Sequence, residues 1–238
     1  MQLTYLPMVP LMALAIYKII TENSKTKYAI VLGVAASIQV LIGTEMLALT
    51  VVLVVTAGVV LVAMNKREVI PIVMKSYRAF FISAITFIIL SGYPLYFSLA
   101  GPEHTIQAIV QNVGFYGTTP SSLYSPTLQL GHAQVGSKLF GYLGPAPLQT
   151  GFIGWVLIIV FFLSLIFLFK KYFWVRFTGI MAIICVWYSL GGNLWTSVGQ
   201  GPKYLTPWWL PWRWLGVVPI VKDIVPQRTM FFFWLVAG

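Results

Sequence analysis

The last part of the chain places four charged residues in a segment that is otherwise apolar and rich in tryptophan and proline: Arg213, Lys222, Asp223 and Arg228. A guanidinium group binds phosphate oxygens through paired hydrogen bonds, and lysine adds a point charge. Arg228 is the strongest candidate, because it starts an apolar stretch whose helical N–H groups and dipole would also favour an anion. The segment therefore predicts a lipid-phosphate site formed by Arg228, Arg213 and Lys222.

The same cations also have a simpler interpretation. Lysine and arginine next to an apolar helix extend toward lipid headgroups and anchor the segment there. Asp223 would then neutralise Lys222 or cap a local turn. Both interpretations stay open at the level of the sequence.

Three other polar residues mark a second candidate site: Glu45, Glu103 and His104. Glu45 lies in LIGTEMLAL, between two apolar stretches, and carboxylates inside membranes usually have a function. However, Thr44 is a suitable N-cap, and a glutamate in the first helical turn is stabilised by the dipole. We favour this structural role for Glu45. Glu103 and His104, in GPEH, are typical of a surface or capping pair.

No pattern predicts a catalytic group, a cofactor or a metal site. His104 and His132 are far apart in one loop, and two histidines alone do not make a zinc site. Cys185 is the only cysteine, which excludes a disulfide within the chain. The acidic residues are isolated from one another; they are Glu22, Glu45, Glu68, Glu103 and Asp223.

The composition shows what must position these residues. Charged residues make up 8% of the chain, against about 25% in soluble domains, and 59% of the chain is hydrophobic. The mean hydropathy is +0.87. This much apolar surface predicts a protein that lies in a lipid bilayer.

A membrane-spanning helix needs about 20 apolar residues. Six stretches approach that length, and a seventh begins near Thr229 and ends with the chain at Gly238. The six stretches are residues 3–20, 28–43, 46–64, 79–100, 150–169 and 175–191. The predicted fold is all-α, a polytopic transmembrane helical bundle of six full helices and a truncated seventh. Residues 1–238 would form a single transmembrane domain.

The basic residues predict the orientation of this bundle. Ten of the 15 fall on one side, which the positive-inside rule makes cytoplasmic. These ten are Lys18, Lys25, Lys27, Lys66, Arg67, Lys75, Arg78, Lys170, Lys171 and Arg176. Two long loops, residues 101–149 and 192–228, are then extracytoplasmic. The net charge of +10 thus reflects topology and anionic lipids rather than nucleic acid.

Loop 192–228 contains five of the nine tryptophans, and such enrichment marks the membrane interface. Its prolines exclude one long helix, so we expect a short helix in the headgroup plane. The chain begins directly with an apolar stretch and its last stretch is short. We therefore expect a fragment of a larger membrane protein.

Several segments carry a resemblance to a known family: LTYLPMVPLM, IQVLIGTEMLALT, GPEH, FGYLGPAPL and PWRWLGVVPIVKDIVPQRTMFFF. Their order resembles the later part of large bacterial multi-pass membrane proteins of the GT-C glycosyltransferase superfamily, related to the protein mannosyltransferases. The resemblance implies a hexosyltransferase in the plasma membrane. Such an enzyme transfers a sugar from a polyprenyl-phosphate donor to an acceptor on the outer face.

This chain departs from the family in one respect. Related enzymes use an acidic pair in the first outer loop as base or metal ligand, and no acidic pair exists here. The catalytic part, with any divalent metal, would therefore lie outside this chain. Two alternatives remain: a carrier or flippase for lipid-linked sugars, for which Pro7, Pro10 and Pro94 would break helices, and a noncatalytic membrane assembly protein. The sequence predicts no oligomeric state.

Overall fold

Helices make up most of the chain that the structure describes, so the predicted helical fold class is confirmed there apart from one small sheet. The computed structural model describes residues 7–22, 25–101, 117, 118, 123, 154–197, 202–215 and 224–237. The chain divides into an N-terminal unit, Met1–Ile109, and a C-terminal unit, Val110–Gly238. Each unit has its own packing and is described by itself.

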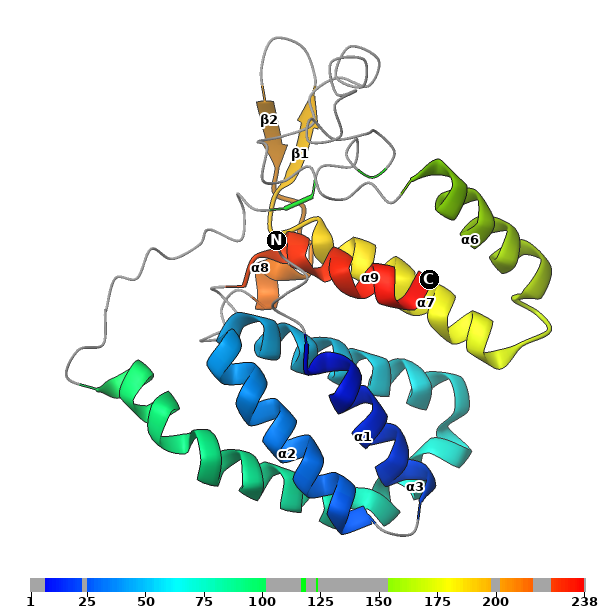
Figure 1. Cartoon of the computed structure of the whole chain (residues 1–238). Coiled ribbons are helices and arrows are strands. Elements are labelled where there is room, and N and C mark those ends of the chain that lie inside the picture. The colour runs from blue at the N-terminus through cyan, green and yellow to red at the C-terminus, as the bar shows by residue number, and fades with distance from the viewer. Residues whose placement is uncertain are drawn as a thin grey trace. The chain divides into compact units, whose positions relative to one another are not determined.

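The N-terminal unit consists of three helices: α1 (Val9–Thr21), α2 (Lys25–Ile42) and α3 (Thr44–Ala100). Figure 1 shows that α3 turns back on itself, so that two halves run beside α2. The predicted third and fourth spans, residues 46–64 and 79–100, are therefore parts of one helical run.

The turn within α3 occurs at Asn65, whose backbone is not helical (φ −150°, ψ 66°). Residues 66–78, which we call the connecting segment, lie between two of the predicted spans and are helical. Lysine, arginine and glutamate are good helix formers, so this charged sequence continues the helix beyond the break. Pro71 and Pro94 lie inside α3 without ending it.

The second half of α3 packs very closely against α2. A Cβ atom on Gly33 would lie 2.6 Å from Thr86 Cβ and 2.7 Å from the Ser83 carbonyl oxygen. Small buried residues surround this contact, with Ala29 and Ser37 one turn before and after Gly33 on α2. Helices in membranes associate through such small residues, because lipid provides no hydrophobic driving force between them.

Contacts between charged and polar side chains join the helix ends of this unit. The Lys18 ammonium bonds to the Glu22 carboxylate at the end of α1. The Lys25 ammonium, at the start of α2, donates to Ser76 Oγ at 2.9 Å and to the Lys75 carbonyl at 3.4 Å. Together with the contact at Gly33, this shows that α2 and the second half of α3 run in parallel.

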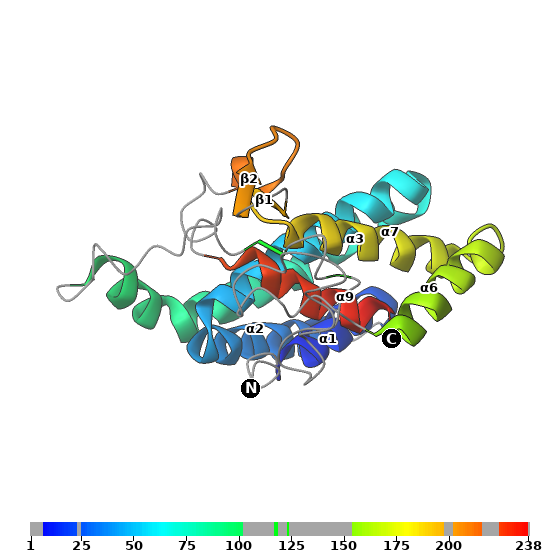
Figure 2. The same cartoon turned by 90° about the horizontal axis from the view of Figure 1, so that it is seen from above.

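The C-terminal unit is built around α7 (Phe173–Ser189). A short turn joins it to α6 (Trp155–Leu168), and α9 (Thr229–Ala237) runs antiparallel to it, as both views show (Figures 1 and 2). Strands β1 (Leu194–Ser197) and β2 (Pro202–Leu205) form an antiparallel hairpin, with Leu194 opposite Leu205. Two short elements follow: α8 (Trp212–Leu215) and the 3-10 turn η5 (Pro226–Arg228).

The expectation of six spanning helices receives only partial support. Two of the described helices are long and apolar enough to cross a membrane, Lys25–Ile42 and Thr44–Phe97. Three more, α1, α6 and α7, are apolar but shorter. No residue of α6 is buried, and large apolar side chains are exposed along it. Apolar surface of this extent is a sign of a membrane or protein interface.

Substitution of Gly33 should disrupt the contact between α2 and α3. We expect Gly33→Ala to lower the stability by about 1–3 kcal/mol, because the new methyl group overlaps a backbone carbonyl. Gly58→Ala is the matched control, since no heavy atom lies within 4 Å of its added Cβ. Thermal unfolding of each purified variant in detergent gives the two unfolding midpoints. Equal midpoints for the two variants would contradict the packing.

The Lys18–Glu22 bond should be visible in the titration of Glu22. Hydrogen bonds from Lys18 and then Tyr28 hold the pKa of the Glu22 carboxyl below its ordinary value. The stabilisation from this pair is therefore present above the ordinary glutamate pKa and is lost as the pH falls through the lowered value. We expect Lys18→Gln to raise the pKa of Glu22 toward normal in a ¹³C NMR titration, whereas Lys66→Gln should leave it unchanged.

Candidate functional site

The end of α7 is where separate segments of the C-terminal unit meet. Gly191 has φ 78°, a left-handed conformation that commonly ends helices. The last carbonyls of a helix have no partner within it and must find donors elsewhere. We call residues 185–190 the α7 terminal turn. Donors from three segments that are distant in sequence reach its carbonyls.

The first segment is the tryptophan-rich turn, residues 206–215. The Trp212 indole is buried, and its Nε1–H donates to the Tyr188 carbonyl. The Trp212 ring also lies edge-on to the Tyr188 ring, with centroids 6.3 Å apart. Trp212 thereby fixes this turn to α7.

The same turn exposes three indoles, those of Trp208, Trp209 and Trp214, and a guanidinium. Trp208 and Trp214 are 73% and 66% exposed, and Trp214 Nε1 donates to the Trp208 carbonyl at 3.0 Å. Arg213 is also exposed, and its Nη1 donates to the Thr206 carbonyl at 2.9 Å. Flat aromatic surfaces and a cation are thus held together on a fixed loop.

The second segment carries Arg228. Thr229 is fully buried, and its hydroxyl lies 3.0 Å from the Cys185 carbonyl oxygen and 2.8 Å from that of Pro226. Arg228 precedes it and is half-buried, and its backbone N–H donates to the Val225 carbonyl at 3.0 Å. The Arg228 backbone is thereby held at the junction between η5 and α9.

The third segment is the pair Gly117–Thr118. The Thr118 N–H donates to the Ser189 carbonyl at 2.6 Å. A Cβ on Gly117 would lie 2.1 Å from the Leu190 carbonyl oxygen, so only glycine allows this approach. The Thr118 hydroxyl is buried and has no hydrogen-bond partner among the described residues.

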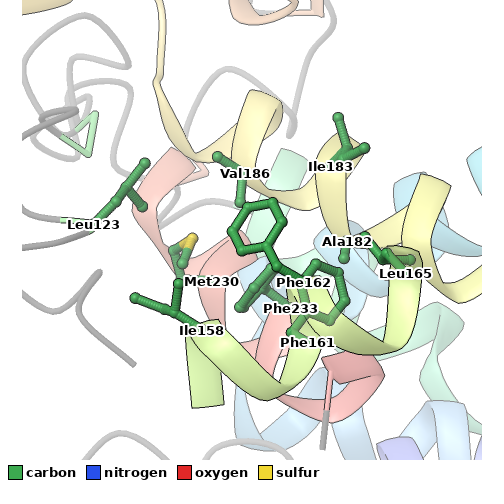
Figure 3. A pocket seen from close by; sticks show the side chains of 10 residues that line it. All are labelled: Leu123, Ile158, Phe161, Phe162, Leu165, Ala182, Ile183, Val186, Met230 and Phe233. Atoms are coloured by element: carbon green, nitrogen blue, oxygen red, sulfur yellow. The ribbon is translucent and has the colours of Figure 1, made fainter. Parts of the chain in front are cut away.

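An apolar cavity of about 310 Å³ lies beneath this region, between α6, α7 and α9 (Figure 3). All its lining side chains are apolar; they include Ile158 and Phe161 from α6, Ala182 and Val186 from α7, and Met230 and Phe233 from α9. A Cβ on Gly179 would lie 2.5 Å from a Leu165 methyl carbon, so α6 and α7 approach closely there. Such a cavity suits a hydrocarbon chain.

The other predicted site residues lie apart from this region or outside the described residues. Lys222, Asp223, Glu103 and His104 fall outside them. Glu45 is half-buried in the first turn of α3, where the helix dipole stabilises a carboxylate. The N-cap is Gly43, not the expected Thr44, whose hydroxyl donates to the Val40 carbonyl instead.

In the part of the chain that the structure describes, no three histidine, cysteine, aspartate or glutamate side chains lie close enough together to bind one metal ion. Cys185 is buried among apolar neighbours in α7. The described site combines two arginines with exposed indoles and an apolar cavity.

Comparisons with known proteins leave the family open, because no family model, curated protein or solved structure matches the chain. The assignment of a function therefore depends on the geometry of the site and on the sequence resemblance.

The sequence indicated the arginines of this site but not the contacts that position them. Trp212 was one of several tryptophans, and nothing in its spacing distinguished a buried anchor from the exposed Trp208 and Trp214. The available signal was SLGGN, since glycine directly after an apolar helix marks a helix end. The carbonyls of that helix end need donors from other segments of the chain.

The Trp212 hydrogen bond should contribute measurably to stability. We expect Trp212→Phe to lower it by about 1–3 kcal/mol, because the Tyr188 carbonyl loses the indole donor and keeps the longer bond from the Gly191 N–H, at 3.4 Å. Trp214→Phe removes an indole N–H that lies on the exposed side of the same turn and should change stability by less than about 1 kcal/mol. Thermal unfolding in detergent compares the two, and an equal loss would show that Trp212 is not the anchor.

Proposed function

We propose that this chain is part of a multi-pass, glycosyltransferase-like protein of the bacterial plasma membrane. It would belong to the GT-C superfamily and transfer a hexose from a polyprenyl-phosphate donor on the outer face. In this proposal the chain supplies the donor site, and the group that activates the acceptor lies outside the described residues.

The convergence at α7 is the observation that carries the proposal. The segments with Arg213 and Arg228 are held by the carbonyls of Tyr188 and Cys185, three residues apart on one helix. Three residues correspond to about 4.5 Å along a helix axis. The segments that carry Arg213 and Arg228 are therefore bonded to neighbouring positions of α7.

Each part of a polyprenyl-phosphate sugar has a chemical counterpart in this arrangement. The two guanidiniums would bind the phosphate and stabilise the charge that develops on it as the sugar departs. The exposed faces of Trp208 and Trp214 suit a sugar ring. The apolar cavity suits the first part of the lipid chain, and Met230 in its wall follows Arg228 by two residues.

The membrane location rests on the apolar surface and on the distribution of charge. Two described helices have the length and composition of spans, and α6 exposes large apolar side chains. The remaining predicted spans, with loops 101–149 and 192–228 outside, belong to the same proposal. Lysine and arginine concentrated at one end of the N-terminal unit agree with this orientation.

Direct binding of the donor lipid tests the site without requiring turnover. The chain in nanodiscs would be titrated with polyprenyl [³²P]phosphate. We expect Arg228→Ala and Arg213→Ala each to weaken binding about tenfold or more, because each removes a charge-assisted hydrogen bond. Lys170→Ala, in the exposed turn after α6, should leave the affinity unchanged.

Two further measurements separate the proposal from its alternatives. Uncharged polyprenol should bind the wild type and both arginine variants equally, since it lacks the phosphate. With a polyprenyl-phosphate hexose, a new glycosidic product supports a transferase, whereas movement of the lipid across vesicles without product supports a carrier. Unchanged phosphate binding in both arginine variants would contradict the site.

A further inference from the structure

The connecting segment of α3, residues 66–78, exposes an unusual combination of side chains. Val73, Met74 and Tyr77 are 51%, 68% and 59% exposed, although they belong to a helix with a well-packed neighbour. Arg67, Lys75 and Arg78 are exposed as well. Exposed apolar side chains next to cations are stable at a boundary between an apolar and a polar phase.

Helical geometry sorts these residues into two adjacent sectors. At about 100° per residue, Val73, Tyr77 and Met74 fall within one sector of roughly 100°, which also contains the exposed Lys66 at the start of the segment. Arg67, Arg78 and Lys75 fall within the next, which is about 80° wide. This is the pattern of a helix that lies in a membrane interface, with an apolar face in the lipid and cations beside the headgroups.

The helix ends around the segment add to its charge and fix its position. All seven lysines and arginines of the described N-terminal unit lie in the last turn of α1, the first turn of α2 or this segment, and they face only two acids there, Glu22 and Glu68. The Lys25 bonds to Ser76 and Lys75 hold the segment against α2. Arg78 Nε donates to the Tyr77 hydroxyl at 3.0 Å, which keeps a cation beside an aromatic ring.

We propose that residues 66–78 form an interfacial helix that binds the headgroups of anionic phospholipids in one membrane leaflet. Val73, Met74 and Tyr77 enter the boundary between headgroups and acyl chains, and Arg67, Lys75 and Arg78 pair with lipid phosphates. The complementary charge selects an anionic leaflet over a zwitterionic one. The proposal rests on the membrane location proposed above and is independent of sugar transfer.

Depth measurements on the full chain test the insertion. In a Cys185→Ala background, Met74→Cys and Ile89→Cys would each carry a fluorophore, in nanodiscs of phosphatidylcholine with phosphatidylglycerol. Lipids brominated at known depths quench the fluorophore. We expect the label at position 74 about 5–10 Å below the headgroup surface, and the label at position 89, which is 74% exposed in the second half of α3, deep in the hydrocarbon.

The two labels distinguish a failure of the interfacial helix from a failure of the proposed membrane location. A deep label at 89 with a label at 74 that aqueous iodide quenches freely would overturn the interfacial helix and leave the membrane location intact. A shallow or aqueous label at 89 would overturn both. Energy transfer between labels at 74 on two copies would assign the apolar sector to a dimer contact and would also overturn the proposal.

Charge reversal tests the choice of lipid. Lys75→Glu with Arg78→Glu should reduce the phosphatidylglycerol retained by the purified chain, counted by native mass spectrometry, by roughly tenfold or more. The matched variant Lys75→Arg with Arg78→Lys keeps both charges and should retain as much as the wild type. Equal retention by the reversed and the charge-conserving variants would overturn the assignment to anionic lipid.

Discussion

The unpaired carbonyls at the end of α7 are the constraint on which the candidate site depends. In apolar surroundings a free carbonyl is costly, because no water replaces the missing partner. The chain meets this need at Tyr188 and Ser189 with the Trp212 indole and the Thr118 N–H, and the Thr229 hydroxyl adds a contact to the Cys185 carbonyl inside the same helix. Because each donor belongs to a different segment, satisfying one helix end also assembles the site.

A different constraint shapes the N-terminal unit, where the helices themselves must approach one another. At Gly33 the backbones of α2 and α3 come so close that no side chain fits. This contact requires the second half of α3 to return along α2, and the break at Asn65 makes that return possible. The exposed connecting segment and its cluster of cations follow from this path.

Structural features that depend on composition and local pattern could be predicted from the sequence. Features that depend on tertiary contacts could be predicted less well. Apolar runs located most helices, and tryptophan and proline marked the turn that carries Arg213. The helix of the connecting segment was not predicted, because only apolar runs were taken to indicate helices, whereas lysine and arginine also favour them. The β1–β2 hairpin was missed because each of its strands, LWTS and PKYL, is only four residues long. The anchoring role of Trp212 depends on a carbonyl 24 residues away, which no local pattern contains.

The two groups of cations differ in how the chain holds them, and this difference separates their roles. Arg67 and Lys75 lie on one exposed face of the connecting segment. Arg213 is bonded to the Thr206 carbonyl, and the Arg228 backbone is held at the η5–α9 junction. A membrane surface requires charge without fixed geometry, whereas stabilising a leaving phosphate requires a donor that is positioned before the reaction. The held Arg213 side chain therefore suits recognition of one phosphate, and the exposed cations of the connecting segment suit a charged surface.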